Sequence, residues 1–216
     1  IQIAGMSIYW STFGSGTSGS WGANAFFNSN VVATLANDWK STLVRAPAGV
    51  MSGSSQAVYN YPQTMNLVKQ VVDAAIANDI YVIVDWHSEN SEPKQSDAVT
   101  FFTEMVQAYP KTPNIIWEIW NEPTSVSWAT VKSYAETIIP IIRAKSPNLI
   151  ICGTPNWSQD VDVAAANPLS DTNTAYALHF YAGSHGATLR TKGENAMKAG
   201  ATLFISEWGT TNANGG

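Results

Sequence analysis

The stretch NIIWEIWNEPT, residues 114–124, carries the pattern on which the fold prediction depends. Its first part is rich in isoleucine and tryptophan, as expected of a strand that is buried on both faces of a parallel sheet. The apolar run then ends in Asn121, Glu122 and Pro123. Charged residues make up only 12% of the chain, so a carboxylate at the end of a buried strand requires an explanation. It is either an ordinary strand-end acid or part of a catalytic site.

Similar apolar segments recur along the chain and alternate with helical ones. Strands are predicted at 3–9, 42–47, 80–86, 114–120, 148–153, 175–181 and 202–207. Apolar residues at helical spacing predict helices at 30–38, 62–78, 95–109, 128–145, 160–166 and 187–199. Repeated strand–helix alternation predicts a parallel sheet, either a closed barrel or an open, doubly wound layer.

Polar side chains at the carboxyl ends of these strands favour the barrel. They are Arg45, His87, Asn121 with Glu122, Asn156, His179 with Tyr181, and Glu207. In a (β/α)8 barrel the carboxyl ends of all strands converge on the face that carries the chemistry. A glycine-rich phosphate-binding turn does not follow any early strand, which weakens the nucleotide-binding alternative. We therefore predict one TIM-type barrel domain that spans residues 1–216.

The composition indicates what kind of ligand this barrel binds. The chain has nine tryptophans, 45% hydrophobic residues and a formal net charge of −5. Few charges with many flat rings suit a neutral, ring-shaped ligand, and the negative charge argues against nucleic acid or an anionic membrane surface as a partner. Apolar runs are shorter than the roughly 18 residues of a membrane span. The single cysteine, Cys152, is expected to be a small buried strand residue.

Glu122 and Glu207 form the candidate catalytic pair. They lie 85 residues apart (207 − 122), or about three strand–helix units, which places them on facing parts of an eight-stranded mouth. Glycosidic bond cleavage needs one carboxylic acid to protonate the leaving oxygen and a carboxylate on the opposite side of the anomeric carbon. Taken singly, each is better explained as a solvated strand-end acid or an aid to a helix N-terminus. The polar residues on matching strand ends favour the pair.

Six motifs follow in order along nearly the whole chain: VRAP, IVDWHS, IWNEPT, GTPNWSQDVD, ALHFYAG and LFISEWGTT. Together they resemble the glycoside hydrolase family 5 endoglucanases, most closely the bacterial subfamily that cuts cellulose and related β-1,4-glucans. The resemblance implies a secreted, extracellular hydrolase that needs no cofactor and binds a β-1,4-linked polysaccharide or oligosaccharide.

The resemblance also implies roles for the matching residues. Glu122 is the acid/base and Glu207 the nucleophile of a retaining double displacement. Asn121 is the partner of the sugar 2-hydroxyl.

Four further residues are implied to support the reaction. Arg45 and Tyr181 hold and tune the nucleophile, and His87 and His179 line the reactive subsite. The alternatives are a structural ion pair for Arg45, core imidazoles for the two histidines, and barrel packing for Tyr181.

The tryptophans fall into groups. Trp21 and Trp157 stand in loops, where a large ring is explained by stacking on sugar or by anchoring the loop. Trp117 and Trp120 either provide apolar walls for Glu122 or pack in the core. Packing is expected for Trp39, Trp128 and Trp208.

A catalytic metal is not expected. The acids that follow His87, namely Glu89, Glu92 and Asp97, do not have the spacing of a zinc or calcium site.

The sequence departs from the family pattern in two ways. Many members have a histidine where this chain has Tyr9 and Trp10, and the family has an eighth strand and closing helices after the stretch that ends this sequence. We expect a barrel that lacks its eighth strand, either truncated or unusually short. Its first and seventh strands would be unpaired edges, through which the chain is predicted to self-associate. The alternative functions are a β-mannanase, a xylanase, or a non-catalytic carbohydrate-binding barrel.

Overall fold

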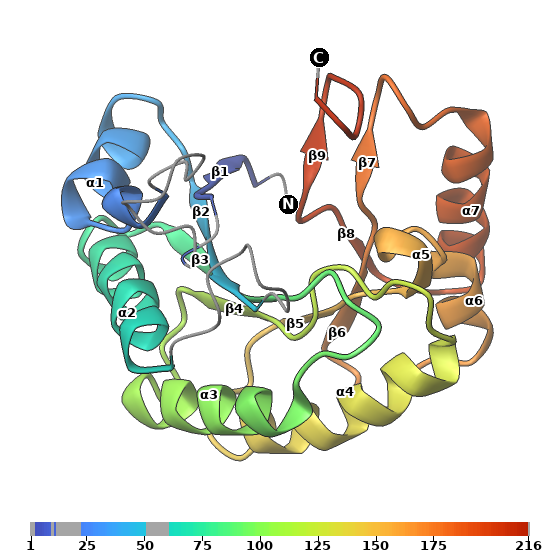
Figure 1. Ribbon diagram of the computed structural model, residues 1–216, viewed down its shortest axis with the longest axis horizontal. Coiled ribbons are helices and arrows are strands. Elements are labelled where there is room, and N and C mark those ends of the chain that lie inside the picture. The colour runs from blue at the N-terminus through green and yellow to red at the C-terminus, as the bar shows by residue number, and fades with distance from the viewer. Residues whose placement is uncertain (1–2, 10, 12–22, 51–60, 216) are drawn as a thin grey trace.

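A computed structural model of the chain describes residues 3–9, 11, 23–50 and 61–215 (Figure 1). Within these residues one parallel sheet has seven strands in the order β1-β2-β3-β4-β5-β6-β8. Its strands are β1 Gly5–Ser7, β2 Leu43–Gly49, β3 Tyr81–His87, β4 Ile115–Glu118, β5 Ile150–Cys152, β6 Thr174–Ala177 and β8 Leu203–Phe204. A second, two-stranded parallel sheet pairs β7, Phe180–Tyr181, with β9, Trp208–Gly209.

Helices cover the outer, convex side of the curled sheet (Figure 1). They are α1 Ser29–Asn37, α2 Tyr61–Ala77, α3 Gln95–Ala108, α4 Trp128–Arg143, α6 Val161–Ala166 and α7 Ala187–Lys198, with short turns η1 Ala23–Phe26 and α5 Pro155–Ser158. Side-chain caps fix two helix starts, because Asn28 accepts hydrogen bonds from the first turn of α1 and Ser127 accepts one from Thr130 in α4. Among the described residues, helices are too short or too polar to cross a membrane.

The two faces of the sheet have different cores. The outer face packs against the helices in one large apolar cluster, which includes the valines and tryptophans of β2, β3 and β4. On the inner face, one layer of small and branched residues fills the bottom of the barrel: Leu43, Ile83, Ile116, Ile151 and Ala177. Residues two positions further along β2, β3 and β4 project inward in the layer above, because side chains alternate along a strand. This layer holds Arg45, Asp85 and Glu118, all fully buried.

The fold agrees with the predicted class, a TIM-type barrel without its eighth strand. The strands curl into a half-barrel whose edges are β1 and β8. Between these edges lies an opening of about 1160 Å³, lined on one side by residues 3–9 and on the other by 203–210. Self-association through these edges stays a prediction.

Two predicted strands are each divided in the structure. The segment 175–181 forms β6 and β7, interrupted at Leu178 and His179, and the segment 202–207 ends at Phe204 before β9 begins. In both places the backbone leaves the main sheet where a polar side chain enters the barrel mouth. These interruptions carry His179 and Glu207, so the strand ends are shaped by the site.

Candidate active site

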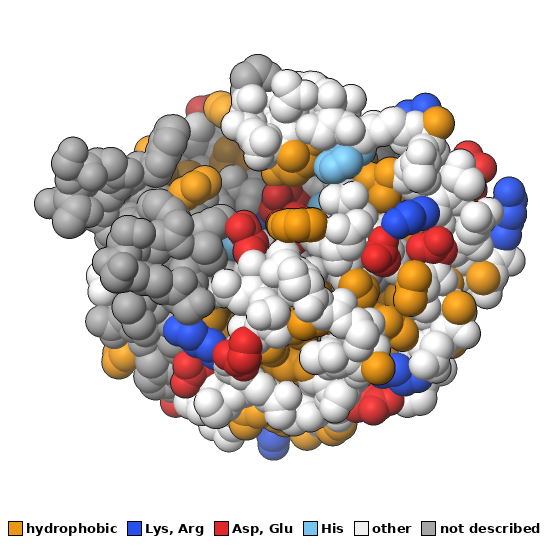
Figure 2. Space-filling model, turned by 45° about the vertical axis from the view of Figure 1, so that its right-hand side comes forward, with side chains coloured by type: hydrophobic (Ala, Val, Ile, Leu, Met, Phe, Trp, Pro, Cys, Tyr) orange, Lys and Arg blue, Asp and Glu red, His pale blue; other side chains and the backbone are white. Residues whose placement is uncertain are grey.

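Glu122 and Glu207 come together at the mouth of the half-barrel. Glu122 follows β4, and Glu207 lies between β8 and β9. One carboxylate oxygen of each lies within 4.8 Å of the other, and their side chains are 10% and 22% exposed. In the hollow near the middle of the face shown in Figure 2, acidic and histidine side chains gather. The two glutamates are therefore neither dispersed surface acids nor core residues.

Both oxygens of Glu207 are held by neutral or cationic donors. Arg45 Nη1 donates to Oε2 over 3.1 Å, and the Tyr181 hydroxyl donates to Oε1 over 2.6 Å. Burial opposes ionisation, but the charges of His179 and Arg45 outweigh it and lower the pKa of Glu207 to about 2. Burial and the bond to Glu207 both raise the pKa of Tyr181, which stays a neutral donor. Glu207 is thus fixed as a carboxylate.

Arg45 is the centre of the inner polar layer. Its Nε donates to Glu118 Oε2 over 2.7 Å, and its Nη2 lies 2.8 Å from Asp85 Oδ2 and 2.6 Å from Asn121 Oδ1. Burial would lower the pKa of Arg45, but the charges of Asp85 and Glu118 raise it. The structural ion pairs expected of Arg45 are present, and the same guanidinium also binds the Glu207 carboxylate, so its contacts agree with both interpretations.

His179 connects Glu122 to this layer. Its Nδ1 lies 2.9 Å from Glu122 Oε1 and its Nε2 lies 2.9 Å from the hydroxyl oxygen of Ser206, which donates to Glu118 Oε1 over 2.5 Å. Burial lowers the pKa of His179, but hydrogen bonding to Glu118 and Glu122 raises it to about 10. A doubly protonated imidazole therefore donates to Glu122 and to Ser206.

His87 lies between two acids on the other side of the mouth. Its Nδ1 is 2.6 Å from Asp85 Oδ2, whereas its Nε2 is 3.6 Å from Glu89 Oε1 and 3.5 Å from Asn121 Nδ2. Burial lowers the pKa of His87, but Asp85 raises it to about 9. His87 and His179 are both almost fully buried, as the core-imidazole alternative required, and both belong to the site.

Asn121 is oriented by its neighbours. Its Oδ1 accepts from Arg45, so its Nδ2 is directed toward His87. Its backbone nitrogen donates to the carbonyl oxygen of Trp86, and its carbonyl accepts a 2.6 Å hydrogen bond from the Ser158 hydroxyl. Asn121 is thus held in place through both its side-chain carboxamide and its backbone.

A turn of unusual conformation follows β5. Asn156, Trp157 and Ser158 have φ of 58°, 57° and 53°, in the left-handed region, which costs about 1–2 kcal/mol for each non-glycine residue. The Trp157 side chain is 48% exposed, and the backbone N–H of this residue donates to the carbonyl oxygen of Pro123, next to Glu122. Trp157 therefore stands at the rim, as a sugar platform requires, and Asn156 beside it is exposed. Trp21 lies outside the described residues.

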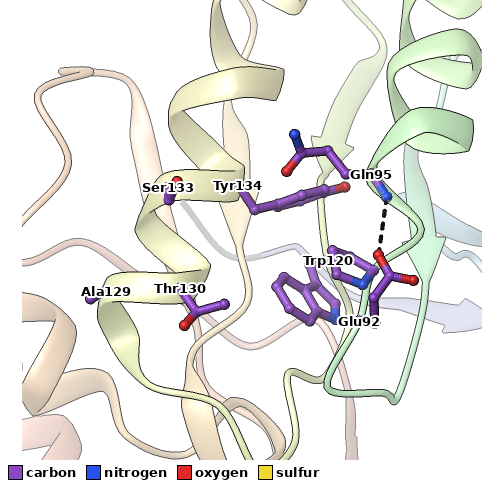
Figure 3. Close-up of a pocket in the computed structure, with 8 residues that line it drawn as sticks. Glu92, Gln95, Trp120, Ala129, Thr130, Ser133 and Tyr134 are labelled. Carbon is purple, nitrogen blue, oxygen red and sulfur yellow. Dashed lines mark hydrogen bonds between the residues drawn. The ribbon is translucent and has the colours of Figure 1, made fainter.

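Trp117 and Trp120 do not wall the acid. Both are fully buried, which agrees with core packing. Trp117 donates to the Ser146 hydroxyl, and Trp120 packs edge-on against Tyr134 with ring centroids 5.2 Å apart. Figure 3 shows Trp120 at the base of an outer hollow of about 450 Å³, between the first turns of α3 and α4. This outer hollow is lined by Glu92, Pro93, Gln95, Trp120, Ala129, Thr130, Ser133 and Tyr134.

Of the other tryptophans, Trp128 is buried as expected, but Trp39 and Trp208 are 62% and 60% exposed. The packing predicted for Trp39 is wrong, whereas Trp208 packs against a neighbouring ring without being buried. Trp208 stacks on Phe180 with ring centroids 6.1 Å apart, beside the opening between β1 and β8.

The residues that sequence reasoning missed are Asp85, Glu118 and Ser206. Asp85 precedes His87 by two positions, and Glu118 belongs to the inward-facing set of β4. The strand period of two would have placed both on the inner face, with Arg45 as the evident cation for them.

Glu122, His179 and Glu207 also offer three donor atoms that all lie within 4.8 Å of one another. A histidine that binds a metal ion must be a neutral imidazole, with one ring nitrogen free of its proton. Because the pKa of His179 is raised to about 10, a proton competes for this position at neutral pH. The set therefore fits a metal ion poorly.

Comparison with known proteins places the chain in a family. Residues 4–216 match the model of cellulase (glycosyl hydrolase family 5). Endoglucanase Z of Dickeya dadantii is 49% identical over 216 residues, which are 99% of this chain and 49% of that protein. Endoglucanase A of Evansella cellulosilytica is 45% identical over 197 residues, 88% of this chain and 40% of that protein. The chain thus spans about half the length of these curated relatives or less.

Solved structures give the same result. A structure from Cytophaga hutchinsonii superposes with a TM-score of 0.88 at 40% identity, covering 99% of this chain and 67% of that one. The catalytic domain of Thermobifida fusca endoglucanase Cel5A, in a variant bound to cellotetraose, has a TM-score of 0.85 at 32% identity, covering 99% of this chain and 70% of that one. The chain belongs to glycosyl hydrolase family 5, the cellulase family.

Proposed function

We propose that this chain carries the catalytic centre of an endo-β-1,4-glucanase that hydrolyses internal bonds of cellulose or related β-glucans by double displacement. The observation that carries the proposal is the pairing of an ionised Glu207, held by Arg45 and Tyr181, with Glu122 less than 4.8 Å away. Retaining glycosidases have carboxyl groups about 5–5.5 Å apart, whereas inverting enzymes need roughly 6.5–9.5 Å for a water. The short separation supports retention.

In the first step Glu207 attacks the anomeric carbon and forms a glycosyl ester, while Glu122 gives its proton to the leaving oxygen. Arg45 and Tyr181 orient the attacking carboxylate. As Glu207 becomes an ester, the Tyr181 hydroxyl loses its anionic acceptor, while the guanidinium of Arg45 stays fixed by Glu118, Asp85 and Asn121.

In the second step Glu122, now a carboxylate, removes a proton from water, and the water oxygen replaces Glu207 at the anomeric carbon. The His179 imidazolium is 2.9 Å from Glu122 and stabilises its ionised form between the two steps. The Nδ2 group of Asn121 is buried and directed toward His87, and we propose that it donates a hydrogen bond to the sugar 2-hydroxyl.

Substrate and location are part of the proposal. Several relatives are named endoglucanases, and a structural neighbour binds cellotetraose, which supports a β-glucan as substrate. Polysaccharides of this kind do not enter cells, so we propose that the protein acts outside the cell. A β-mannanase or xylanase would use the same two glutamates with other rim contacts.

Hydrolysis of carboxymethylcellulose, mannan and xylan by the chain, with Glu207→Gln as control, tests the proposal. We expect reducing sugar to be released fastest from carboxymethylcellulose and not at all by the control. A faster reaction on mannan or xylan would change the substrate assignment. If none of the three is cleaved while oligosaccharides still bind, the chain is a carbohydrate-binding half-barrel.

A further inference from the structure

The turn α5, Pro155–Ser158, has a backbone conformation that its own residues do not favour. Asn156, Trp157 and Ser158 follow one another with φ of 58°, 57° and 53°. A Cβ clashes with the backbone in this left-handed region, so residues other than glycine keep it only where surrounding contacts hold them there. Such strain gathers at functional sites. Most of the contacts that hold this turn are made by Ser158, with segments that belong to the candidate active site.

The turn holds the backbone on both sides of Glu122. The Ser158 hydroxyl donates to the carbonyl oxygen of Asn121 over 2.6 Å, and this carbonyl belongs to the peptide group that joins Asn121 to Glu122. On the other side of Glu122, the carbonyl oxygen of Pro123 accepts a 3.2 Å hydrogen bond from the backbone N–H of Trp157. The main chain that carries the acid/base is therefore fixed by α5 before and after the glutamate.

Ser158 also holds the segment that carries His179. Its carbonyl oxygen accepts a 2.9 Å hydrogen bond from the His179 backbone N–H, at the interruption between β6 and β7. Thr154, just before the turn, donates its N–H to the Ser158 hydroxyl oxygen and its own hydroxyl to the carbonyl oxygen of Ala177, each over 3.3 Å. One serine thus connects the ends of β4, β5 and β6. The imidazole of His179 and the carboxyl group of Glu122, which meet at 2.9 Å, both stand on backbone that Ser158 holds.

Water cannot take the place of the Ser158 hydroxyl, because Ser158 is fully buried. Removal of the hydroxyl leaves the Asn121 carbonyl without this donor and the Thr154 N–H without this acceptor. The peptide group between Asn121 and Glu122 is then free to tilt, and the carboxyl group tilts with it. A displacement of about 1 Å between reacting groups can lower a rate by on the order of 100-fold. The hydroxyl is therefore placed to affect the reaction without touching the substrate.

We propose that Ser158 is a positioning residue, which holds the backbone of Glu122 and of His179 so that the acid meets the leaving oxygen. The inference rests on the proposed glycosidase function. Ser158 takes no part in the bond changes, because its hydroxyl is buried and already binds Asn121 and Thr154. It sets the direction from which the Glu122 proton reaches the leaving group.

The test compares cellotetraose, whose leaving group is a sugar alcohol, with 2,4-dinitrophenyl β-cellobioside, whose phenolate leaves without a proton. A misplaced acid slows bond cleavage only in the first substrate. We expect Ser158→Ala to lower kcat/KM for cellotetraose by roughly tenfold more than kcat/KM for the dinitrophenyl glycoside. The loss should be in kcat, with KM for cellotetraose changed by less than about twofold. A general loss of structure would instead lower the rates on both substrates equally.

Ser158→Gly separates the hydroxyl from the backbone strain. Glycine adopts a φ of 53° without strain, so this variant should have a higher Tm than Ser158→Ala, yet show the same selective loss on cellotetraose. The matched control is Lys111→Gly. Lys111 is an exposed left-handed residue with φ of 57° that precedes β4, at the end of the sheet opposite the mouth, so this change should leave the ratio of the two rates unaltered. Equal losses on both substrates, or wild-type activity in either Ser158 variant, would overturn the inference.

Hydrogen exchange separates this inference from the proposed function. The backbone N–H groups of Asn121, Glu122 and His179 are all hydrogen-bonded, so their exchange rates report how firmly these segments are held. Ser158→Ala should speed their exchange by roughly tenfold relative to the N–H groups of α3, as expected for the loss of one buried hydrogen bond. If the wild-type chain cleaves neither substrate, the proposed function is wrong, and the exchange rates still decide the role of Ser158. Faster exchange at these three residues supports the positioning role, and unchanged exchange overturns it.

Discussion

Arg45 holds Oε2 of Glu207 over 3.1 Å from a position that is 1% exposed. The same guanidinium is fixed by Glu118, Asp85 and Asn121. A buried cation with this many partners cannot move without breaking several charged hydrogen bonds, so the Glu207 carboxylate is oriented by a rigid group.

Arg45→Lys should impair both stability and catalysis. A lysine ammonium is a compact point donor and cannot reach Glu118, Asn121 and Glu207 together. We expect a loss of about 3 kcal/mol in the free energy of unfolding, because buried carboxylates lose their partner, and a fall in kcat of at least about 100-fold. The acid limb of the pH–rate profile should move to higher pH as the pKa of Glu207 rises.

The matched control is Arg143→Lys. Arg143 forms a two-point ion pair with Asp171, at 2.7 and 2.8 Å, on the outer surface between α4 and β6. This change also removes donors to the carbonyl oxygens of Asn148 and Asn173, so it should cost about 1–3 kcal/mol, but it should leave the pH–rate profile unchanged. An Arg45→Lys enzyme with the wild-type acid limb would contradict the role assigned to Arg45.

The free energy of unfolding should be highest, and nearly independent of pH, between the ordinary pKa values of glutamate and histidine. The folded pKa of His87 and His179 is raised from 6.5 to about 9 and about 10, so their contribution is complete below pH 6.5 and is lost as pH rises through those values. The folded pKa of Glu118 and Glu207 is lowered from 4.5 to about 2, so their contribution is present above pH 4.5 and is lost as pH falls toward 2.

Urea denaturation across this range measures the effect, which should amount to a few kcal/mol at each end. His179→Gln should make the fall of the unfolding free energy at alkaline pH less steep. An alkaline side that stays equally steep in His179→Gln and His87→Gln would show that these histidines are not charged in the folded state.

The sequence predicted the scaffold well because its strands and helices are strongly periodic. The predicted 95–109 and 128–145, for example, correspond to α3 Gln95–Ala108 and α4 Trp128–Arg143. The predicted strand ends also indicated that Glu122, Glu207 and their nearest partners lie together, because parallel strands carry their carboxyl ends to one edge of the sheet.

Other features depend on contacts between distant segments, which the local sequence shows only in part. Asp85 and Glu118 are charged residues within apolar strands, and their burial depends on Arg45 from a different strand. Trp208 is predicted to pack from its neighbours in sequence, yet it is 60% exposed in the two-stranded sheet of β7 and β9. The left-handed turn at Trp157 contains no glycine, so local propensity gave no signal for it.

Trp157→Ala should weaken glucan binding without unfolding the chain. The side chain is 48% exposed beside the loop of Glu122, so little core packing is lost. Loss of one stacked ring should raise KM by on the order of tenfold with a small change in kcat. Tyr81→Ala is the control, because Tyr81 is 45% exposed at the amino-terminal end of β3, opposite the end that carries His87, and it does not line the opening between β1 and β8. Equal KM effects of the two variants would remove Trp157 from the binding surface.

The two glutamates should fail in different ways when each is replaced by alanine. Glu207→Ala should abolish turnover of every substrate, because the described part of the mouth offers Arg45 and Tyr181 beside it but not a second nucleophile. Glu122→Ala should abolish cleavage of cellulose, whose leaving group is a poor sugar alcohol, but should largely spare the first step with an aryl glycoside, whose phenolate leaves unaided.

The second step then lacks its general base, so Glu122→Ala should show an initial burst of phenolate followed by slow turnover. Azide should restore turnover by attacking the glycosyl ester from the side that Glu122 has vacated, where His179 donates to Glu122 in the intact enzyme. The azide product should have the β configuration, because two inversions at the anomeric carbon restore the starting one. A burst and azide rescue in Glu207→Ala only would mean that the two roles are reversed, and an α-configured product from Glu122→Ala would contradict double displacement itself.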